Sequence, residues 1–150
     1  MSFQLGSRFT YNSDGSLIAG VPRSNDSVVE VWNTETFDVV TTLSGHTSWI
    51  AAISWATNTT LATVSDDETT RIWDAQTGQQ LDVLDTGYTS TPDFSPDGSL
   101  FAAAAIDQVN VIREVIGGDV LAALGSTTTP IADAGPIRLS PTAVTMALSG

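Results

Sequence analysis

The sequence predicts an all-β protein built from repeated units of four antiparallel strands. Three observations support this fold class. Landmark residues recur about every 40 positions along the 150 residues. Short stretches rich in β-branched and aromatic residues alternate with Asn, Asp, Gly and Thr turns. No stretch shows a sustained helical spacing of apolar residues.

The repeat is clearest when residues 28–43, 69–84 and 109–124 are set side by side. The landmarks form three columns: Trp32, Trp73 and Arg113; Leu43, Leu84 and Leu124; and, six residues before the first column, Asp26, Asp67 and Asp107. The members of each column are separated by 41 and then 40 residues. Such concordance indicates a repeated structural unit, not a chance similarity.

Within the central unit we expect strands at 49–55, 60–64, 69–73 and 79–84. An aromatic residue, a turn and an apolar strand follow one another in "YNSDGSLIAG", "WATNTTLATV", "FSPDGSLFAA" and again in "LSPTAVTMAL". "SPDGS" is a strong turn, because Pro presets one backbone angle and Gly accepts a positive φ. "AAAA" at 102–105 falls where the repeat places an inner strand, so we expect strand there and not helix.

A four-stranded repeat of about 40 residues is typical of a β-propeller blade. We therefore expect one domain over 1–150, an incomplete or open β-propeller with units at about 9–43, 44–84 and 85–124 and an incomplete unit at 125–150. Closed propellers have about 4 to 8 blades. A fragment of a longer propeller is the favoured explanation; closure through self-association and a small open stack of sheets remain alternatives.

Composition limits the choice of partners. The chain has 17 acidic and 5 basic residues, all of the latter Arg, and a net charge of −12. Phosphate backbones and anionic lipids would repel it, so we expect neither nucleic acid nor membrane as a partner. There is no cysteine, and the first residues lack the pattern of a signal peptide. We expect a cytoplasmic protein.

The segment from Gly45-His46 to Trp73-Asp74 resembles a repeat of the WD-repeat β-propeller family. The first unit departs from the pattern, with Trp32-Asn33 in place of Trp-Asp. The third departs further, with Gly87-Tyr88 and Arg113-Glu114 at the two ends of the repeat. The resemblance covers roughly residues 9 to 150, and the central unit carries most of it.

The resemblance implies that His46, Thr63 or Ser65, Asp67 and Trp73 form a hydrogen-bonded structural tetrad. A buried carboxylate and a buried imidazole need such partners, and Trp offers an indole N–H donor. A catalytic role for the histidine would instead require a serine exposed to substrate. We therefore expect His46 to be structural. In the third unit Asp107 is expected to pair with Arg113.

Signatures of enzymes are missing from the sequence. Without lysine there is no phosphate-loop lysine and no Schiff base, and no G-x-S-x-G occurs. One histidine cannot build a His-rich metal site. "SDDE" at 65–68 lacks the spaced ligands of a calcium loop and is better explained as a turn. We expect no catalytic residues, no metal and no cofactor.

Similarity to WD-repeat domains implies a non-catalytic scaffold for proteins or peptides. The expected binding face lies at the loops entering the first strand and joining the second and third: Thr47, Trp49, Asn25, Asp66, Tyr88 and Ile106. Trp49 is the best candidate anchor, because its indole combines apolar area with a donor; packing between blades is the alternative. The negative charge favours a basic partner. Trp55, aligned with Tyr11 and Phe94, is expected in the core.

A second hypothesis concerns the less typical units. "VEVWNTETFDVVTTL" and "NVIREVIGGDVLAAL" also look like YVTN-type or quinoprotein-like bacterial propellers, which would imply an enzymatic or cofactor-binding role. Such propellers place their chemistry around the central channel. The sequence offers no matching ligand set, so this hypothesis remains the alternative.

Overall fold

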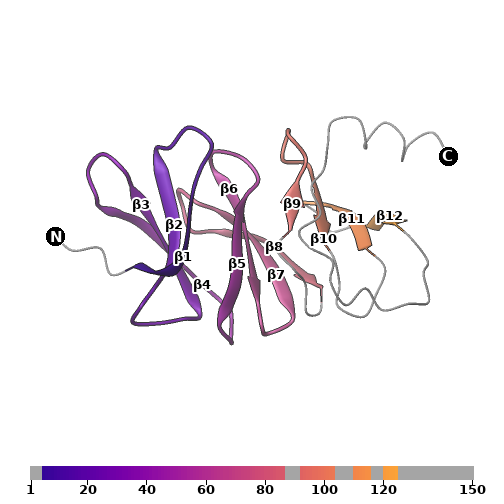
Figure 1. The fold of residues 1–150 in the computed structure, drawn as a ribbon, viewed down its shortest axis with the longest axis horizontal. Coiled ribbons are helices and arrows are strands. Elements are labelled where there is room, and N and C mark those ends of the chain that lie inside the picture. Colours follow the sequence, from indigo (N-terminus) through magenta and orange to yellow (C-terminus); the bar gives the residue numbers. More distant parts are fainter. Residues whose placement is uncertain (1–4, 87–91, 104–109, 116–119, 125–150) are drawn as a thin grey trace.

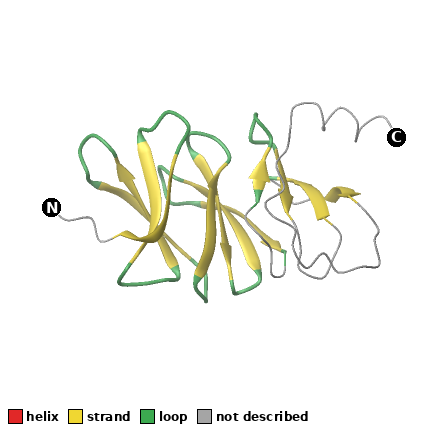
Figure 2. Cartoon of the chain, in the orientation of Figure 1, coloured by secondary structure: helices red, strands yellow, loops and turns green. Residues whose placement is uncertain are grey.

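The computed structural model describes residues 5–86, 92–103, 110–115 and 120–124. All regular structure in these residues is β-strand, arranged as three four-stranded antiparallel sheets (Figure 2). The sheets follow one another along the long axis of the molecule (Figure 1). The predicted all-β class, with blade-like sheets of four antiparallel strands, is confirmed.

Each sheet uses four strands in chain order. The first sheet contains β1 (Leu5–Tyr11), β2 (Leu17–Pro22), β3 (Val28–Asn33) and β4 (Val39–Ser44). The second contains β5 (Ile50–Trp55), β6 (Thr60–Ser65), β7 (Thr69–Asp74) and β8 (Gln80–Asp85). The third contains β9 (Asp93–Phe94), β10 (Leu100–Ala103), β11 (Asn110–Glu114) and β12 (Val120–Leu124).

The backbone repeats as the sequence does. In each sheet the ladder between the third and fourth strands is irregular at the same landmark, after Val31, Ile72 and Ile112 respectively. The turn before β10 has the predicted chemistry, since Gly98 has a φ of 70° and Ser95 Oγ donates to Asp97 at 2.6 Å. Of the alanine run, Ala102 and Ala103 lie in β10, and the next two residues lie outside the described residues.

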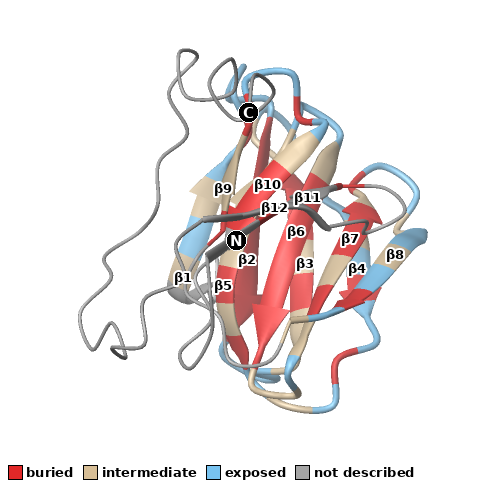
Figure 3. Ribbon diagram, turned by 90° about the vertical axis from the view of Figure 1, so that its right-hand side faces the viewer, coloured by how far each residue is buried: buried red, intermediate tan, exposed pale blue. Residues whose placement is uncertain are grey.

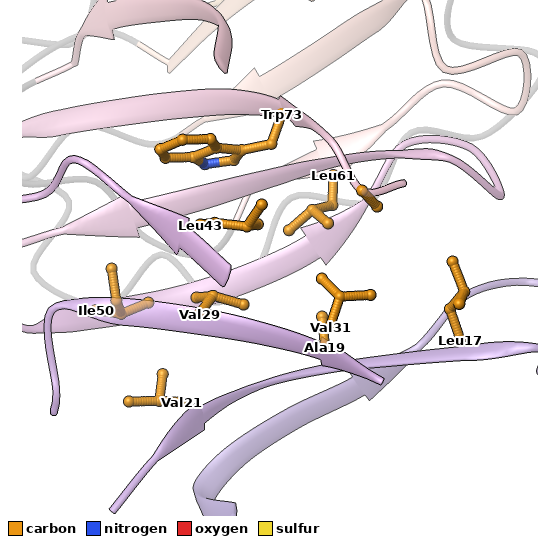
Figure 4. Close-up of a cluster of buried hydrophobic side chains, with 10 residues drawn as sticks. Leu17, Ala19, Val21, Val29, Val31, Leu43, Ile50, Leu61 and Trp73 are labelled. Carbon is orange, nitrogen blue, oxygen red and sulfur yellow. The ribbon is translucent and has the colours of Figure 1, made fainter. Parts of the chain in front are cut away.

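Apolar side chains fill the space between neighbouring sheets. One buried cluster joins the first and second sheets (Figure 4): Leu17, Ala19, Val21, Val29, Val31, Leu43, Ile50, Leu61, Trp73 and Ala75. A second joins the second and third sheets: Ala62, Ile72, Leu84, Phe101 and Val115. Trp55 packs against the first cluster and its indole N–H donates to the Thr10 carbonyl at 3.1 Å. Each sheet therefore covers the apolar flank of the next.

In the first two sheets the second strand is the most buried and the fourth strand is the most exposed. All six residues of β2 are buried, whereas β4 and β8 alternate with many exposed positions (Figure 3). Phe9 and Tyr11 on β1 are 55% and 57% exposed. They occupy the register positions of Ile53 and Trp55, which pack against the first sheet. Among the described residues no sheet covers the flank that Phe9 and Tyr11 occupy.

Candidate functional site

The single histidine lies in the loop between β4 and β5, and its ring is held inside the second sheet. His46 Nδ1 lies 2.8 Å from Asp67 Oδ2, and Nε2 lies 2.7 Å from Thr63 Oγ1. The Trp73 indole N–H donates to the same Thr63 oxygen at 2.8 Å. We refer to His46, Thr63, Asp67 and Trp73 as the tetrad.

The tetrad sets the direction of each hydrogen bond. Ionised Asp67 can only accept, so Nδ1–H of His46 donates to it. Nε2 then has a lone pair and accepts from the Thr63 hydroxyl, whose oxygen accepts from Trp73. Both nitrogens of His46 are engaged in a buried ring, which leaves neither free to take a proton from a substrate.

Asp67 is the most connected member of the tetrad. Its Oδ2 also accepts from the Thr47 amide at 3.0 Å, and its Oδ1 accepts from the Thr69 amide at 3.0 Å and the Thr69 hydroxyl at 2.6 Å. Burial alone would raise the pKa of Asp67, but the hydrogen bonds from Thr69, Thr47 and His46 together hold this pKa well below its ordinary value. The carboxylate stays ionised and ties the loop before β5 to the turn before β7.

Ser65 is not the hydroxyl of the tetrad. Its Oγ donates to the Ser48 carbonyl at 3.1 Å and accepts from the Asp67 amide at 3.1 Å. Thr63 and Ser65 lie on one face of β6 because side chains alternate along a strand. Thr63, opposite Ile53, is the one within reach of His46. Of the two predicted hydroxyls, Ser65 instead supports the adjacent turn.

The first and third units have different residues at some of the positions that form the tetrad in the second sheet. In the first sheet Gly20 lies opposite Phe9, as Thr63 lies opposite Ile53, so no hydroxyl is present there. In the third unit Tyr88, Asp107 and the side chain of Arg113 lie outside the described residues. The expected pairing of Asp107 with Arg113 stays a prediction.

The chain is expected to lose stability as pH falls below about 6.5, through His46. Burial lowers the pKa of His46 from 6.5, against the opposing effect of Asp67. Between pH 6.5 and the lowered pKa of the folded protein, His46 is protonated in the unfolded chain and neutral in the folded one. The free energy of unfolding therefore falls as the pH drops through this range. Asp67 adds a further loss below its ordinary pKa of 3.8.

Urea unfolding at about pH 7.5 and about pH 5.5 measures the effect of His46. His46→Gln is the matched control, because the chain has a single histidine. The free energy of unfolding of His46→Gln should be lower than that of the wild type at both pH values. It should not show the decrease between about pH 7.5 and about pH 5.5 that we assign to protonation of His46. Equal pH slopes in the wild type and the variant would contradict the prediction.

Four of the predicted binding residues gather at one end of the first two sheets. The Asp66 amide donates to the Trp49 carbonyl at 3.1 Å, and the Ile50 amide donates to the Asp26 carbonyl at 2.7 Å. These bonds bring together the β2–β3 turn, the loop before β5 and the β6–β7 turn, which carry the four predicted residues: Asn25, Thr47, Trp49 and Asp66. Tyr88 and Ile106 lie outside the described residues.

Trp49 is the prominent side chain at this end. It is 36% exposed, and its indole N–H donates to Asp66 Oδ2. The guanidinium of Arg8 lies over the ring, with its Cζ 4.3 Å from the ring centroid. Arg8 was not among the predicted site residues. The sequence gives little indication of its role, because Arg8 is one basic residue just before the first predicted unit, 9–43, of an acidic chain.

Asn25 and Thr47 are exposed but have different surroundings. Asn25 Oδ1 accepts from the Ser27 amide and hydroxyl at 3.0 and 2.8 Å, which fixes the β2–β3 turn. Thr47 is anchored through its amide to Asp67. In the described residues no group of three or more His, Asp or Glu side chains is placed to hold a metal ion. Of the "SDDE" carboxylates, Asp66 accepts a hydrogen bond from Trp49 and Asp67 accepts one from His46.

Comparison with known proteins identifies the repeat. The family described as "WD domain, G-beta repeat" matches residues 37–74. Eukaryotic translation initiation factor 3 subunit I is 40% identical over 78 residues in Xenopus tropicalis and 37% in Homo sapiens, covering 51% of this chain and 23% of each relative. Nuclear distribution protein nudF of Aspergillus niger is 32% identical over 106 residues, covering 67% of this chain and 24% of that protein.

The matched segment, 37–74, contains the whole tetrad and the loop that carries Trp49. The chain spans about a quarter of the length of these relatives. The matches give no support to a YVTN-type or quinoprotein-like propeller. Repeat spacing, four-stranded sheets and the matched segment agree, and together with the similar proteins they support the WD-repeat family for this chain.

Proposed function

We propose that the chain is a non-catalytic scaffold that binds a protein or peptide at the end of the sheets carrying Trp49. The single observation that carries the proposal is the exposed Trp49 ring, held in place by Asp66 beside the tetrad. A rigid aromatic side chain on a fixed loop can bury apolar area in a complex without losing much conformational freedom. The name of one relative, a subunit of an initiation factor, also fits a role in assembly.

The tetrad supports a non-catalytic role. Both ring nitrogens of His46 are used in bonds that hold the blade together. A general base must instead offer a lone pair to a substrate proton. Thr63, the hydroxyl nearest to the ring, is 1% exposed and could not reach a substrate carbonyl. The tetrad fixes the loop that presents Trp49.

The charge of the chain favours a basic partner. With a net charge of −12, association should be steered by opposite charge and should weaken as salt rises. The same charge disfavours nucleic acid and anionic membranes.

The described residues contain no helix long and apolar enough to span a bilayer. A cytoplasmic location remains part of the proposal.

We expect Trp49→Ala to weaken binding of basic peptides by about fivefold or more, as for an anchor residue. The measurement is calorimetric titration with basic and acidic peptides at low and high salt, with duplex DNA and anionic vesicles as further ligands. Leu81→Ala is the control, because Leu81 is 38% exposed on the outer strand β8. Equal binding of acidic and basic peptides, or equal losses in both variants, would contradict the proposal.

We further propose that the units 9–43, 44–84 and 85–124 are blades of one domain and that another blade-type sheet covers the Phe9 and Tyr11 flank. Ile53 and Trp55, at the same register positions, pack against a neighbouring sheet, whereas Phe9 and Tyr11 are more than half exposed. Sedimentation of the isolated chain should reveal self-association that Phe9→Asp weakens. A monomer that melts in one sharp transition would contradict this proposal.

A further inference from the structure

Arg8 lies over the face of the residue that we propose as the binding anchor. Its Cζ is 4.3 Å from the centroid of the Trp49 ring. Arg8 belongs to β1 of the first sheet, whereas Trp49 belongs to the loop that enters β5 of the second. β1 and β5 lie side by side, so the contact crosses between two blades (Figure 1). A guanidinium over an indole at this distance is a cation–π contact.

The backbone of β1 is irregular next to Arg8. Leu5 pairs with Pro22 and Phe9 pairs with Gly20, so four steps along β1 match two steps along β2. Two residues are therefore extra in β1. Bulges of this kind change the direction of a side chain locally. Arg8, directly before Phe9, lies in this irregular stretch and contacts the neighbouring sheet.

Trp49 and Asp66 together have the chemistry of a site for a cation. The ring presents its electron-rich face, and the carboxylate at its edge accepts the indole N–H, which fixes the ring and adds negative charge. A planar guanidinium can lie on an indole and also bond to a carboxylate, whereas a lysine ammonium cannot stack in the same way. The residue found there is an arginine of the chain itself.

We propose that Arg8 is an internal occupant of a docking site for an arginine side chain of a partner protein, and that the partner's arginine displaces it. The inference rests on the proposed function, because it places the partner at Trp49. An occupied site binds an external ligand more weakly, in proportion to the fraction of molecules in which the site is free. Arg8 therefore lowers the affinity for an external ligand, whereas the Trp49 ring and the Asp66 carboxylate favour arginine over lysine.

The test uses a short glycine–serine peptide with spaced arginines and the same peptide with lysines. Binding is followed through the indole N–H resonance of Trp49 in the full chain, assigned by its loss in Trp49→Phe. In Arg8→Gln the arginine peptide should bind about threefold to tenfold more tightly than in the wild type, as removal of a competing state requires. The lysine peptide should bind more weakly than the arginine peptide in both proteins, because an ammonium cannot stack on the indole as a guanidinium does.

Two controls separate competition from net charge. Arg23→Gln removes one positive charge from the exposed β2–β3 turn at the same end of the sheets. Arg8→Lys keeps the charge and removes the planar group. We expect the arginine peptide to bind Arg23→Gln about as it binds the wild type, and Arg8→Lys more tightly than the wild type.

The outcomes distinguish the two proposals. If the arginine peptide needs Trp49 but binds Arg8→Gln and Arg23→Gln equally well, Arg8 is not a competitor; the inference is overturned and the proposed function survives. If neither peptide perturbs the Trp49 resonance in any variant, both proposals fail. A gain for the arginine peptide that appears in Arg8→Gln and is absent from Arg23→Gln supports both.

Discussion

Trp73→Ala should lower the free energy of unfolding by about 3–5 kcal/mol, the range for truncation of a buried Trp. Trp73 is 2% exposed and belongs to the cluster that joins the first two sheets. Its removal leaves a cavity there and takes the indole donor from Thr63. Urea unfolding followed by far-ultraviolet circular dichroism measures the loss.

Two further variants separate the packing of Trp73 from its hydrogen bond and compare a buried Trp with an exposed one. Trp73→Phe keeps most of the packing and removes the N–H donor, so we expect a smaller loss, with about 1–2 kcal/mol from the missing bond. Trp49→Ala, at a partly exposed ring, should cost less than about 1 kcal/mol. If Trp73→Ala cost no more than Trp49→Ala, the two sheets would not share the core described above.

Asp67→Asn should lower the free energy of unfolding by about 3 kcal/mol, as expected when one partner of a buried ion pair or charged hydrogen-bond network is removed. Asp67 accepts four hydrogen bonds, from His46, Thr47 and the amide and hydroxyl of Thr69. An asparagine has one acceptor oxygen and directs its NH₂ group at donors. The loop before β5 should loosen together with the tetrad.

Asp66→Asn is the matched control for Asp67, because the two residues are neighbours in one turn. Asp66 accepts from the partly exposed Trp49 indole, a bond at the surface. We expect this change to cost less than about 1 kcal/mol. Both variants are compared by urea unfolding at neutral pH. Equal losses would show that the tetrad carries no special share of the stability of the blade.

Much of the fold could be predicted from the sequence because the repeat constrains it. Strands were expected at 60–64 and 69–73, and β6 and β7 occupy Thr60–Ser65 and Thr69–Asp74. β-branched residues, turns at regular intervals and the recurring landmarks all indicate the same four-stranded unit. Trp55 was expected in the core, and it packs there.

The candidate site was less predictable. The sequence left Thr63 and Ser65 as equal candidates, because side chains two residues apart share one face of a strand. Arg8 was missed, because its contact with Trp49 joins β1 to the loop before β5, and no local residue pattern indicates a contact between sheets. Tyr11 aligns with Trp55 in sequence but is exposed, since burial depends on whether another sheet is present.

The sequence by itself determined the repeat of four strands, because local turn chemistry and alternation repeat with the unit. Its resemblance to WD repeats implied the residue types of the tetrad. The tertiary structure alone decided which hydroxyl bonds to His46 and which cation covers Trp49. Both depend on strand register and on contact between sheets, which join residues far apart in the chain. Such contacts arise when strands and sheets pack, so no local pattern of residues specifies them.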